Sequence, residues 1–137
     1  DMPAEPLYPF GYGLSFTRWE YSSLRLSSTE CGVRDKIDAT VDLKNAGLVD
    51  GWEVVQLYVR DDVSSVVTPV KQLKGFQRVF VKAGETVAVT IPLEVSKLCV
   101  VREDGTEAVE PGAFTVMMGP DSRDESLLKA KLEVREP

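Results

Sequence analysis

Carboxylates are the side chains best suited to chemistry here, because the 137-residue sequence contains no histidine. That absence removes the commonest general base and metal ligand and excludes Ser/His/Asp catalysis. Two acidic groups, Asp61 with Asp62 and Asp121 with Asp124 and Glu125, are candidates for a calcium site or an acid/base pair. Adjacent acids in polar turns are more commonly solvated or cap backbone amides. We therefore predict no catalytic residue, no metal ion and no cofactor.

Flat aromatic rings are the second chemical resource, since carbohydrate-binding sandwiches stack sugars on such rings. Trp52, Trp19 and Tyr58 are the candidates for sugar stacking. Trp52 is the strongest of the three because it follows Gly51 at the tip of a predicted turn. A tryptophan in that position also commonly packs on its own loop or on a neighbouring domain, so both interpretations stay open.

A third aromatic group lies in AEPLYPFGYGLSFT, residues 4–17, which holds Tyr8, Phe10, Tyr12 and Phe16. Two prolines and two glycines interrupt the segment too often for a helix or a central strand. A flexible linker would be polar and poor in rings, because exposed aromatic surface promotes association. We predict that this segment is buried against another part of a larger protein.

Composition is typical of a folded globular chain, with 43% hydrophobic and 28% charged residues. The net charge of −6, with basic residues scattered singly, argues against a nucleic-acid partner. No apolar run approaches the roughly 20 residues that cross a bilayer, so no membrane partner is predicted. A bridge between Cys31 and Cys99 is geometrically possible, but two buried free thiols are the more common state of such a pair.

Hydrophobic residues alternate with a period of two from about residue 24 onward, which is the period of β-strands. In KIDATVDLKNAG, residues 36–47, one face is apolar and the other is polar. Both faces of EVVQLYVRDD are fairly apolar, which predicts a more central strand. The predicted strands are, in order, SSLRLSS, KIDATVDLKN, EVVQLYVRDD, QLKGFQRVFV, ETVAVTIPLE, LCVVREDG, GAFTVMMG and LLKAKLEV.

Two strands carry irregular features. In QLKGFQRVFV the apolar pattern through Leu73, Phe76, Val79 and Val81 changes phase near Gly75, which predicts a β-bulge. In ETVAVTIPLE the proline at position 92 predicts an edge position or a strand end. The pair Asp104-Gly105 predicts a hairpin turn in the next connection.

Short strands, frequent turn residues and no helical period predict an all-β fold. The expected architecture is an antiparallel two-sheet sandwich, immunoglobulin-like or fibronectin type III-like. An up-and-down barrel is the alternative, but uneven connections such as DDVSSVVTP suit a sandwich better.

Four motifs resemble the C-terminal fibronectin type III-like domain of glycoside hydrolase family 3, the β-glucosidase and β-xylosidase family. The first is PLYPFGYGLSFT, residues 6–17, which resembles the segment that enters that domain. It is followed by NAGLVDGWEVVQLYVRD (45–61), PVKQLKGFQRV (69–79) and EPGAFTVMMG (110–119). The motifs occur in the family's order. Four positions depart from the family pattern. Phe16 replaces a usual tyrosine, Thr68 a frequent arginine and Trp52 a small or polar residue, and Cys99 lies in a stretch that often carries aromatic residues.

The resemblance implies a division of the chain into residues 1–18, a linker that packs on an upstream domain, and residues 19–137, the sandwich. Tyr8, Phe10, Tyr12 and Phe16 would then line the interdomain junction. In this family the nucleophilic aspartate belongs to an upstream (β/α)₈ barrel and the acid/base carboxylate usually to an α/β domain. The resemblance therefore places no catalytic residue in this chain.

The function expected from the resemblance is that of a non-catalytic accessory domain, which stabilises and positions the catalytic domains of a β-glucosidase or related exo-glycosidase acting on plant-type glycans. Its partners would be the upstream catalytic domains of the same polypeptide. A periplasmic or secreted location follows from the same analogy. Two alternatives stay open, a carbohydrate-binding module that binds oligosaccharide and a protein-interaction or adhesion sandwich.

Overall fold

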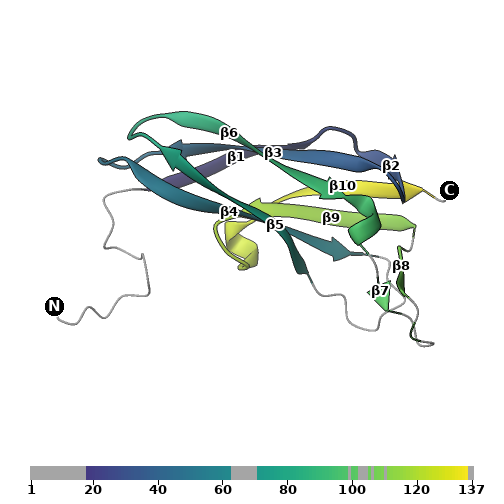
Figure 1. Ribbon diagram of the computed structural model, residues 1–137. Helices are drawn as coiled ribbons and strands as arrows, with labels where there is room; N and C mark the ends of the chain where they lie inside the picture. Colours follow the sequence, from purple (N-terminus) through teal and green to yellow (C-terminus); the bar gives the residue numbers. More distant parts are fainter. Residues whose placement is uncertain are drawn as a thin grey trace, which may run out of the picture.

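The computed structural model describes residues 18–62, 71–98, 100–101, 105, 107–109 and 111–135. They form two β-sheets that lie face to face and a small two-stranded sheet at one end (Figure 1). The first five strands are β1 (Trp19–Leu26), β2 (Glu30–Gly32), β3 (Lys36–Asn45), β4 (Gly51–Asp61) and β5 (Gln72–Val81). The other five are β6 (Thr86–Glu94), β7 (Val100–Val101), β8 (Glu107–Ala108), β9 (Gly112–Gly119) and β10 (Leu128–Arg135).

The strand order is β1-β3-β6 in one sheet, β2-β10-β9-β4-β5 in the other and β7-β8 in the small sheet. All neighbours pair antiparallel except β2 and β10, which are parallel. The predicted all-β, two-sheet sandwich is therefore confirmed. The parallel pair was not predicted, because a strand of three residues is too short for a period to be recognised.

Helical structure in the described residues is limited to two single 3₁₀ turns, η1 (Val95–Lys97) and η2 (Asp124–Ser126). Neither turn is long or apolar enough to cross a membrane. The absence of a 3.6-residue period in the sequence agrees with this, since no described segment has one apolar helical face to bury.

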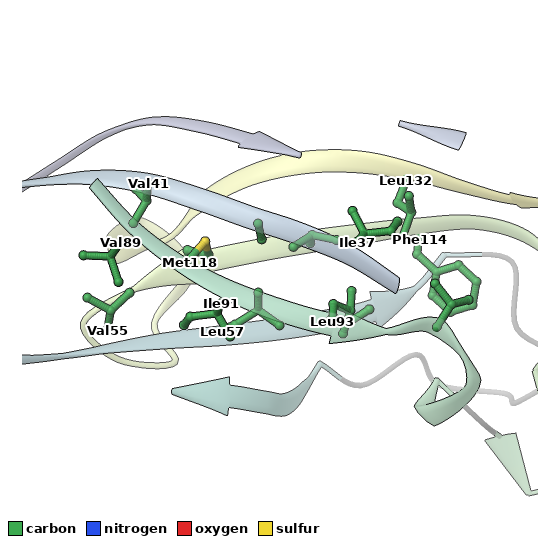
Figure 2. Packing of buried hydrophobic residues seen from close by; sticks show 14 of the residues in the cluster. Ile37, Val41, Val55, Leu57, Val89, Ile91, Leu93, Phe114, Met118 and Leu132 are labelled. Carbon is green, nitrogen blue, oxygen red and sulfur yellow. The ribbon is translucent and has the colours of Figure 1, made fainter. Parts of the chain in front are cut away.

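The core lies between the two large sheets and is built from the alternate residues of each strand (Figure 2). On β3 the side chains of Ile37, Ala39, Val41 and Leu43 are buried, as their spacing predicts. Phe114 of β9 is the largest fully buried side chain. Each buried Val, Leu or Ile contributes about 1.5–3 kcal/mol by removal from water, so this layer is the main source of stability.

Strand positions in the sheets also follow the sequence. β4 lies between β9 and β5, which confirms the central position predicted from its two apolar faces. β6 is an edge strand of the three-stranded sheet, and Pro92 on it pairs with Asp38 of β3. An edge position tolerates proline because one side of the strand needs no ladder hydrogen bond.

The predicted bulge in β5 is present. Leu57 of β4 pairs with Gly75, whereas the next residue, Tyr58, pairs with Leu73, so Lys74 is the extra residue. The bulge places Leu73 and also Phe76 on the outer face of the sheet, where both are exposed. The apolar residues of this strand therefore do not share one face, since Val81 is buried whereas Leu73 and Phe76 are exposed.

Gly75 itself points inward and lies close to the other sheet. A Cβ atom on Gly75 would lie 2.8 Å from Cγ2 of Ile91 on β6, closer than such atoms approach in proteins. Glycine at this position therefore lets β5 lie near β6. Because Lys74 is the extra residue in the bulge, Leu73 and Phe76 on either side of it face the same way.

Asn45, the last residue of β3, fixes the loop that connects β3 to β4. The side chain is fully buried, and its Nδ2 donates to the carbonyls of Val49 at 2.9 Å and Val81 at 3.0 Å. Its Oδ1 accepts from the backbone N–H of Gly47 at 2.9 Å. One carboxamide thus satisfies three backbone groups and joins the β3–β4 loop to the end of β5.

Replacement of Asn45 by alanine should lower the free energy of unfolding by about 2–3 kcal/mol, because two carbonyls and one N–H lose their partner at a buried position. Urea unfolding of the chain followed by tryptophan fluorescence measures this change. Lys44→Ala, the adjacent and exposed position, is the control and should change stability by less than about 0.5 kcal/mol. Equal stabilities of the two variants would contradict the role assigned to Asn45.

Candidate binding surface and polar clusters

The outer side of strands β4 and β5 exposes large apolar side chains. We call this surface the β4–β5 outer face and define it by Trp52, Val54, Leu73, Phe76 and Phe80. Trp52 is 55% exposed and Phe76 is 68% exposed. Among the residues that the structure describes, every exposed large hydrophobic side chain lies on this face or in the β3–β4 loop.

Trp52 packs sideways against two residues of β5. It pairs with Phe80 across the strands, with 5.3 Å between the ring centroids and 59° between the ring planes. The guanidinium of Arg78 lies over the indole ring, with Cζ 4.0 Å from the centroid. This cation–π contact occupies one face of the ring. Only the opposite face of Trp52 is then available to a sugar.

The other two candidates for sugar stacking lie apart from Trp52. Tyr58 is on the same face of β4 but six residues further along, about 20 Å away at the rise of a β-strand, and its hydroxyl donates to Oε1 of Gln56. Trp19 begins β1 in the opposite sheet and packs, half-buried, against the core. The structure therefore does not bring the three rings together into one platform.

Several residues singled out in the sequence lie outside the described part of the chain. They are Tyr8, Phe10, Tyr12, Phe16, Thr68, Cys99 and Asp104. Of the residues near them, Gly105 has a φ of +86°, as a hairpin glycine often does. Cys31 is a free, buried thiol, and burial raises its pKa.

Asp62 is the centre of a polar cluster at the end of β4. Its carboxylate accepts hydrogen bonds from Thr115 Oγ1 at 2.6 Å, Lys131 Nζ at 2.9 Å and Arg60 Nε at 2.9 Å. Burial by itself would raise the pKa of Asp62, but these three donors outweigh it and hold the pKa below its usual value. The cluster ties β4, β9 and β10 together on the outer side of the sheet.

The acids in the loop between β9 and β10 have structural contacts. Asp121 accepts from the backbone N–H of Arg123 at 3.0 Å and forms an ion pair with its guanidinium. Asp124 forms an ion pair with Lys71, which lowers the pKa of Asp124, while Glu125 is exposed. Asp121 thus caps a backbone amide, as expected for an acid in a turn. No three His, Cys, Asp or Glu side chains in the described ranges are grouped so as to hold a metal ion.

A half-buried acid that the sequence did not indicate, Glu53, links the two sheets. Tyr21 Oη on β1 donates to Glu53 Oε2 on β4 at 2.9 Å. Burial raises the pKa of Glu53, although hydrogen bonds from Tyr21 and from the N–H of Val54 favour the ionised form. Burial and the nearby carboxylate raise the pKa of Tyr21 as well. Nothing in the local sequence signals this pair, because its members lie 32 residues apart.

Comparison with known proteins places this arrangement in a family. The sequence profile described as fibronectin type III-like domain matches residues 53–122, about half of the chain. The chain belongs to the fibronectin type III-like domain family. The region matched includes β5, β6, β9 and all of β4 except its first two residues. It therefore contains Val54, Leu73, Phe76, Phe80 and Asp62, whereas Trp52 and Lys131 lie outside it.

Relatives of this fibronectin type III-like domain are glycosidases. It is 41% identical over 130 residues to a β-xylosidase of Formosa agariphila. The aligned region covers 95% of this chain and 18% of that protein. It is 41% identical over 122 residues to a periplasmic β-glucosidase of Salmonella typhimurium, covering 89% of this chain and 16% of that protein. The domain therefore spans less than a fifth of the length of these relatives.

The fold is also found in a solved glycosidase. A β-glucosidase structure from Erythrobacter marinus superposes with a TM-score of 0.81 at 36% identity, over 95% of this chain and 17% of that one. The motif resemblance is thus confirmed. The domain's relatives are β-glucosidases and β-xylosidases, as expected for the C-terminal domain of a family 3 glycoside hydrolase.

Glu53 should make the stability of this domain depend on pH. Folding raises the pKa of Glu53. The stabilisation that Glu53 gives the folded state is therefore fully present below the ordinary pKa of glutamate and is lost as pH rises through the raised pKa. Glu53→Gln, which keeps an acceptor for Tyr21 without a charge, should therefore gain stability relative to the wild type as pH rises from about 4 towards 7. Urea unfolding across this range tests the prediction, and a pH-independent difference would contradict it.

Asp62 should have the opposite dependence. Because its pKa is lowered in the folded state, its contribution is present above the ordinary pKa of aspartate and is lost as pH falls through the lowered value. Asp62→Asn should lower the free energy of unfolding by about 1–3 kcal/mol at pH 7, and this difference from the wild type should be smaller at acidic pH. Thermal unfolding at pH 7 and pH 3 measures both values. The exposed Asp38→Asn is the control, and an equal effect of both substitutions would refute the cluster's role.

Proposed function

We propose that this chain is a non-catalytic accessory domain of a longer glycosidase and that it stabilises and positions the catalytic domains of that enzyme. The observation that carries the proposal is the small share of each relative's length that this chain covers. About nine-tenths of the chain or more aligns with proteins named β-xylosidase or β-glucosidase, yet the alignment takes up only 16–18% of their length. More than four-fifths of such a polypeptide is then left for the catalytic domains.

The parent enzyme is proposed to be a retaining β-glucosidase or a related exo-glycosidase that acts on plant-type glycans. Retaining hydrolysis needs two carboxyl groups about 5–5.5 Å apart on either side of the glycosidic bond. In this domain the Asp62 carboxylate is occupied by three donors, and Glu53 is bound to Tyr21 between the sheets. Because both carboxyl groups already have hydrogen-bond partners within the domain, we place the catalytic carboxylates in the part of the polypeptide before it. The periplasmic location of the Salmonella relative supports a periplasmic or secreted parent.

The proposed domain organisation has residues 1–18 as a linker on the upstream domain and residues 19–137 as the sandwich. The first described strand begins at Trp19, and the carbonyl of Arg18 accepts a hydrogen bond from Ala46 N at 2.6 Å. In this organisation Tyr8, Phe10, Tyr12 and Phe16 line the junction, where their burial contributes on the order of several kcal/mol. Part of that gain is offset by the entropy lost when the segment becomes ordered.

A carbohydrate-binding function is the second candidate, and the exposure of Trp52 is the observation that favours it. One face of that ring is covered by Arg78, and the two other candidates for sugar stacking, Tyr58 and Trp19, lie apart from it. The accessory function is therefore the better supported of the two. A protein-interaction or adhesion function for a separate partner rests on the fold alone.

Activity assays test the accessory function. The purified 137-residue chain should not hydrolyse nitrophenyl β-glucoside or nitrophenyl β-xyloside, whereas the full-length polypeptide that carries it should hydrolyse one of them. Deletion of the domain should lower the melting temperature of the remaining polypeptide, because its docking contacts are lost. Circular dichroism checks that the purified chain is folded. Hydrolysis that co-purifies with the folded chain would contradict the proposal.

A further inference from the structure

We propose that the β4–β5 outer face and the tip of the β3–β4 loop form the surface on which the upstream catalytic part of the same polypeptide docks. This inference rests on the proposed function, since it needs an upstream part to exist. It goes further because it assigns one face of the sandwich, a set of residues and a chemistry to the contact.

The two outer faces of the sandwich differ in chemistry. The outward residues of β3 alternate among lysine, aspartate and threonine, and Thr40 shares a hydrogen bond with Thr90 of β6. The outward residues of β4 and β5 are mainly aromatic or aliphatic, and β5 is the edge strand of its sheet. Natural proteins cover or charge such edges, because an exposed apolar edge strand pairs with other chains. An apolar face on one side only is typical of a surface that is buried in an assembly.

The apolar face begins where the chain enters the sandwich. Trp19 pairs with Asn45, the last residue of β3, and Ala46 N is bound to the carbonyl of Arg18. The loop that follows exposes Leu48 to 82% and Val49 to 45%. A domain joined to the chain before Arg18 is therefore connected to the sandwich at the end that carries this loop and the first residues of the β4–β5 outer face. Tethering makes the contact intramolecular, so modest contact energy is sufficient for docking.

The loop is held in place before any partner binds. The buried Asn45 side chain binds the carbonyl of Val49, and Asp50 Oδ1 accepts from the N–H of Ala83 at 2.8 Å, which joins the loop to the turn after β5. Leu48 and Val49 are thus presented on fixed backbone. Preorganisation of this kind reduces the entropy lost when a surface is buried.

Arg78 defines the chemistry of the partner surface. Between Trp52 and Tyr58 on β4, and along the part of β5 that pairs with it, Arg78 is the only charged outward residue. It stacks on Trp52 and forms no ion pair with a carboxylate in the described part of the chain. An apolar partner surface that carries one carboxylate opposite Arg78 would complement this face.

Oxidative footprinting of the full-length polypeptide and of the 137-residue chain tests the inference. Hydroxyl radicals modify exposed aromatic side chains, and mass spectrometry locates the modified residues. Labelling of Trp52, Phe76 and Phe80 should be several-fold lower in the full-length polypeptide. Unchanged labelling of these residues, with protection of another face, would overturn the inference but leave the accessory function standing. Unchanged labelling over the whole sandwich would overturn both.

A matched pair of variants gives a second readout. Phe76→Lys places a charge on the β4–β5 outer face, and Ala88→Lys places the same side chain on the exposed side of β6 in the other sheet. In the full-length polypeptide, Phe76→Lys should lower the melting temperature and speed proteolytic release of the domain, while Ala88→Lys should change neither. In the 137-residue chain both variants should melt like the wild type. If Phe76→Lys lowered the melting temperature of the 137-residue chain as much as that of the full-length polypeptide, the inference would be overturned, because Phe76 would then stabilise the fold itself.

Two other occupants of the face are distinguished in the same preparations. A dimer of the 137-residue chain that persists in the full-length polypeptide and is dissociated by Phe76→Lys would assign the face to a second copy and overturn the inference. Titration of the full-length polypeptide with cello- and xylo-oligosaccharides gives the other outcome. Saturable heat lost on Trp52→Ala, together with sugar-dependent protection of Trp52, would assign the face to sugar and also overturn the inference.

Discussion

The strict two-residue period of the β-strand is the constraint on which the rest of the structure depends. Each side chain of β4 points either to the core or to the outside, so the register that buries Val55 and Leu57 also exposes Trp52 and Val54. The core and the outer surface are therefore two results of one choice of register. The apolar outer face of β4 and β5 cannot be removed by a local rotation, because the same rotation would expose the core.

Regular strands could be predicted from the sequence because their burial pattern is local. The alternation in β3, the central position of β4 and the edge position of β6 all follow from residues within one strand. The bulge in β5 could be placed near Gly75, but its effect on Leu73 and Phe76 could not be derived. That effect depends on the single residue, Lys74, by which β5 is offset against β4. One inserted residue reverses the direction of the side chains beyond it.

Contacts between distant parts of the chain were not predictable. Tyr21 and Glu53 meet only because β1 and β4 lie in opposite sheets, and the Asp62 cluster needs β4, β9 and β10 side by side. One of the three hydrogen bonds of the Asn45 side chain reaches Val81, at a strand end 36 residues away, and no local pattern shows this contact. Of the rings expected to stack on sugar, Trp52 is exposed, while the positions of Trp19 and Tyr58 depend on how the sheets are arranged. The sequence thus shows which acidic and aromatic residues are candidates for a site. The residues that they contact depend on how the strands are ordered in the two sheets.

Gly75 connects the inside of the sandwich to its outside. Because β5 approaches β6 at this residue, a Cβ atom at position 75 has no room beside Ile91 unless the strand or the Ile91 side chain moves. The same strand carries Phe76 and Phe80 on its outer face. A larger residue at position 75 would therefore act on the outer face through the backbone of β5, without contact with either aromatic ring.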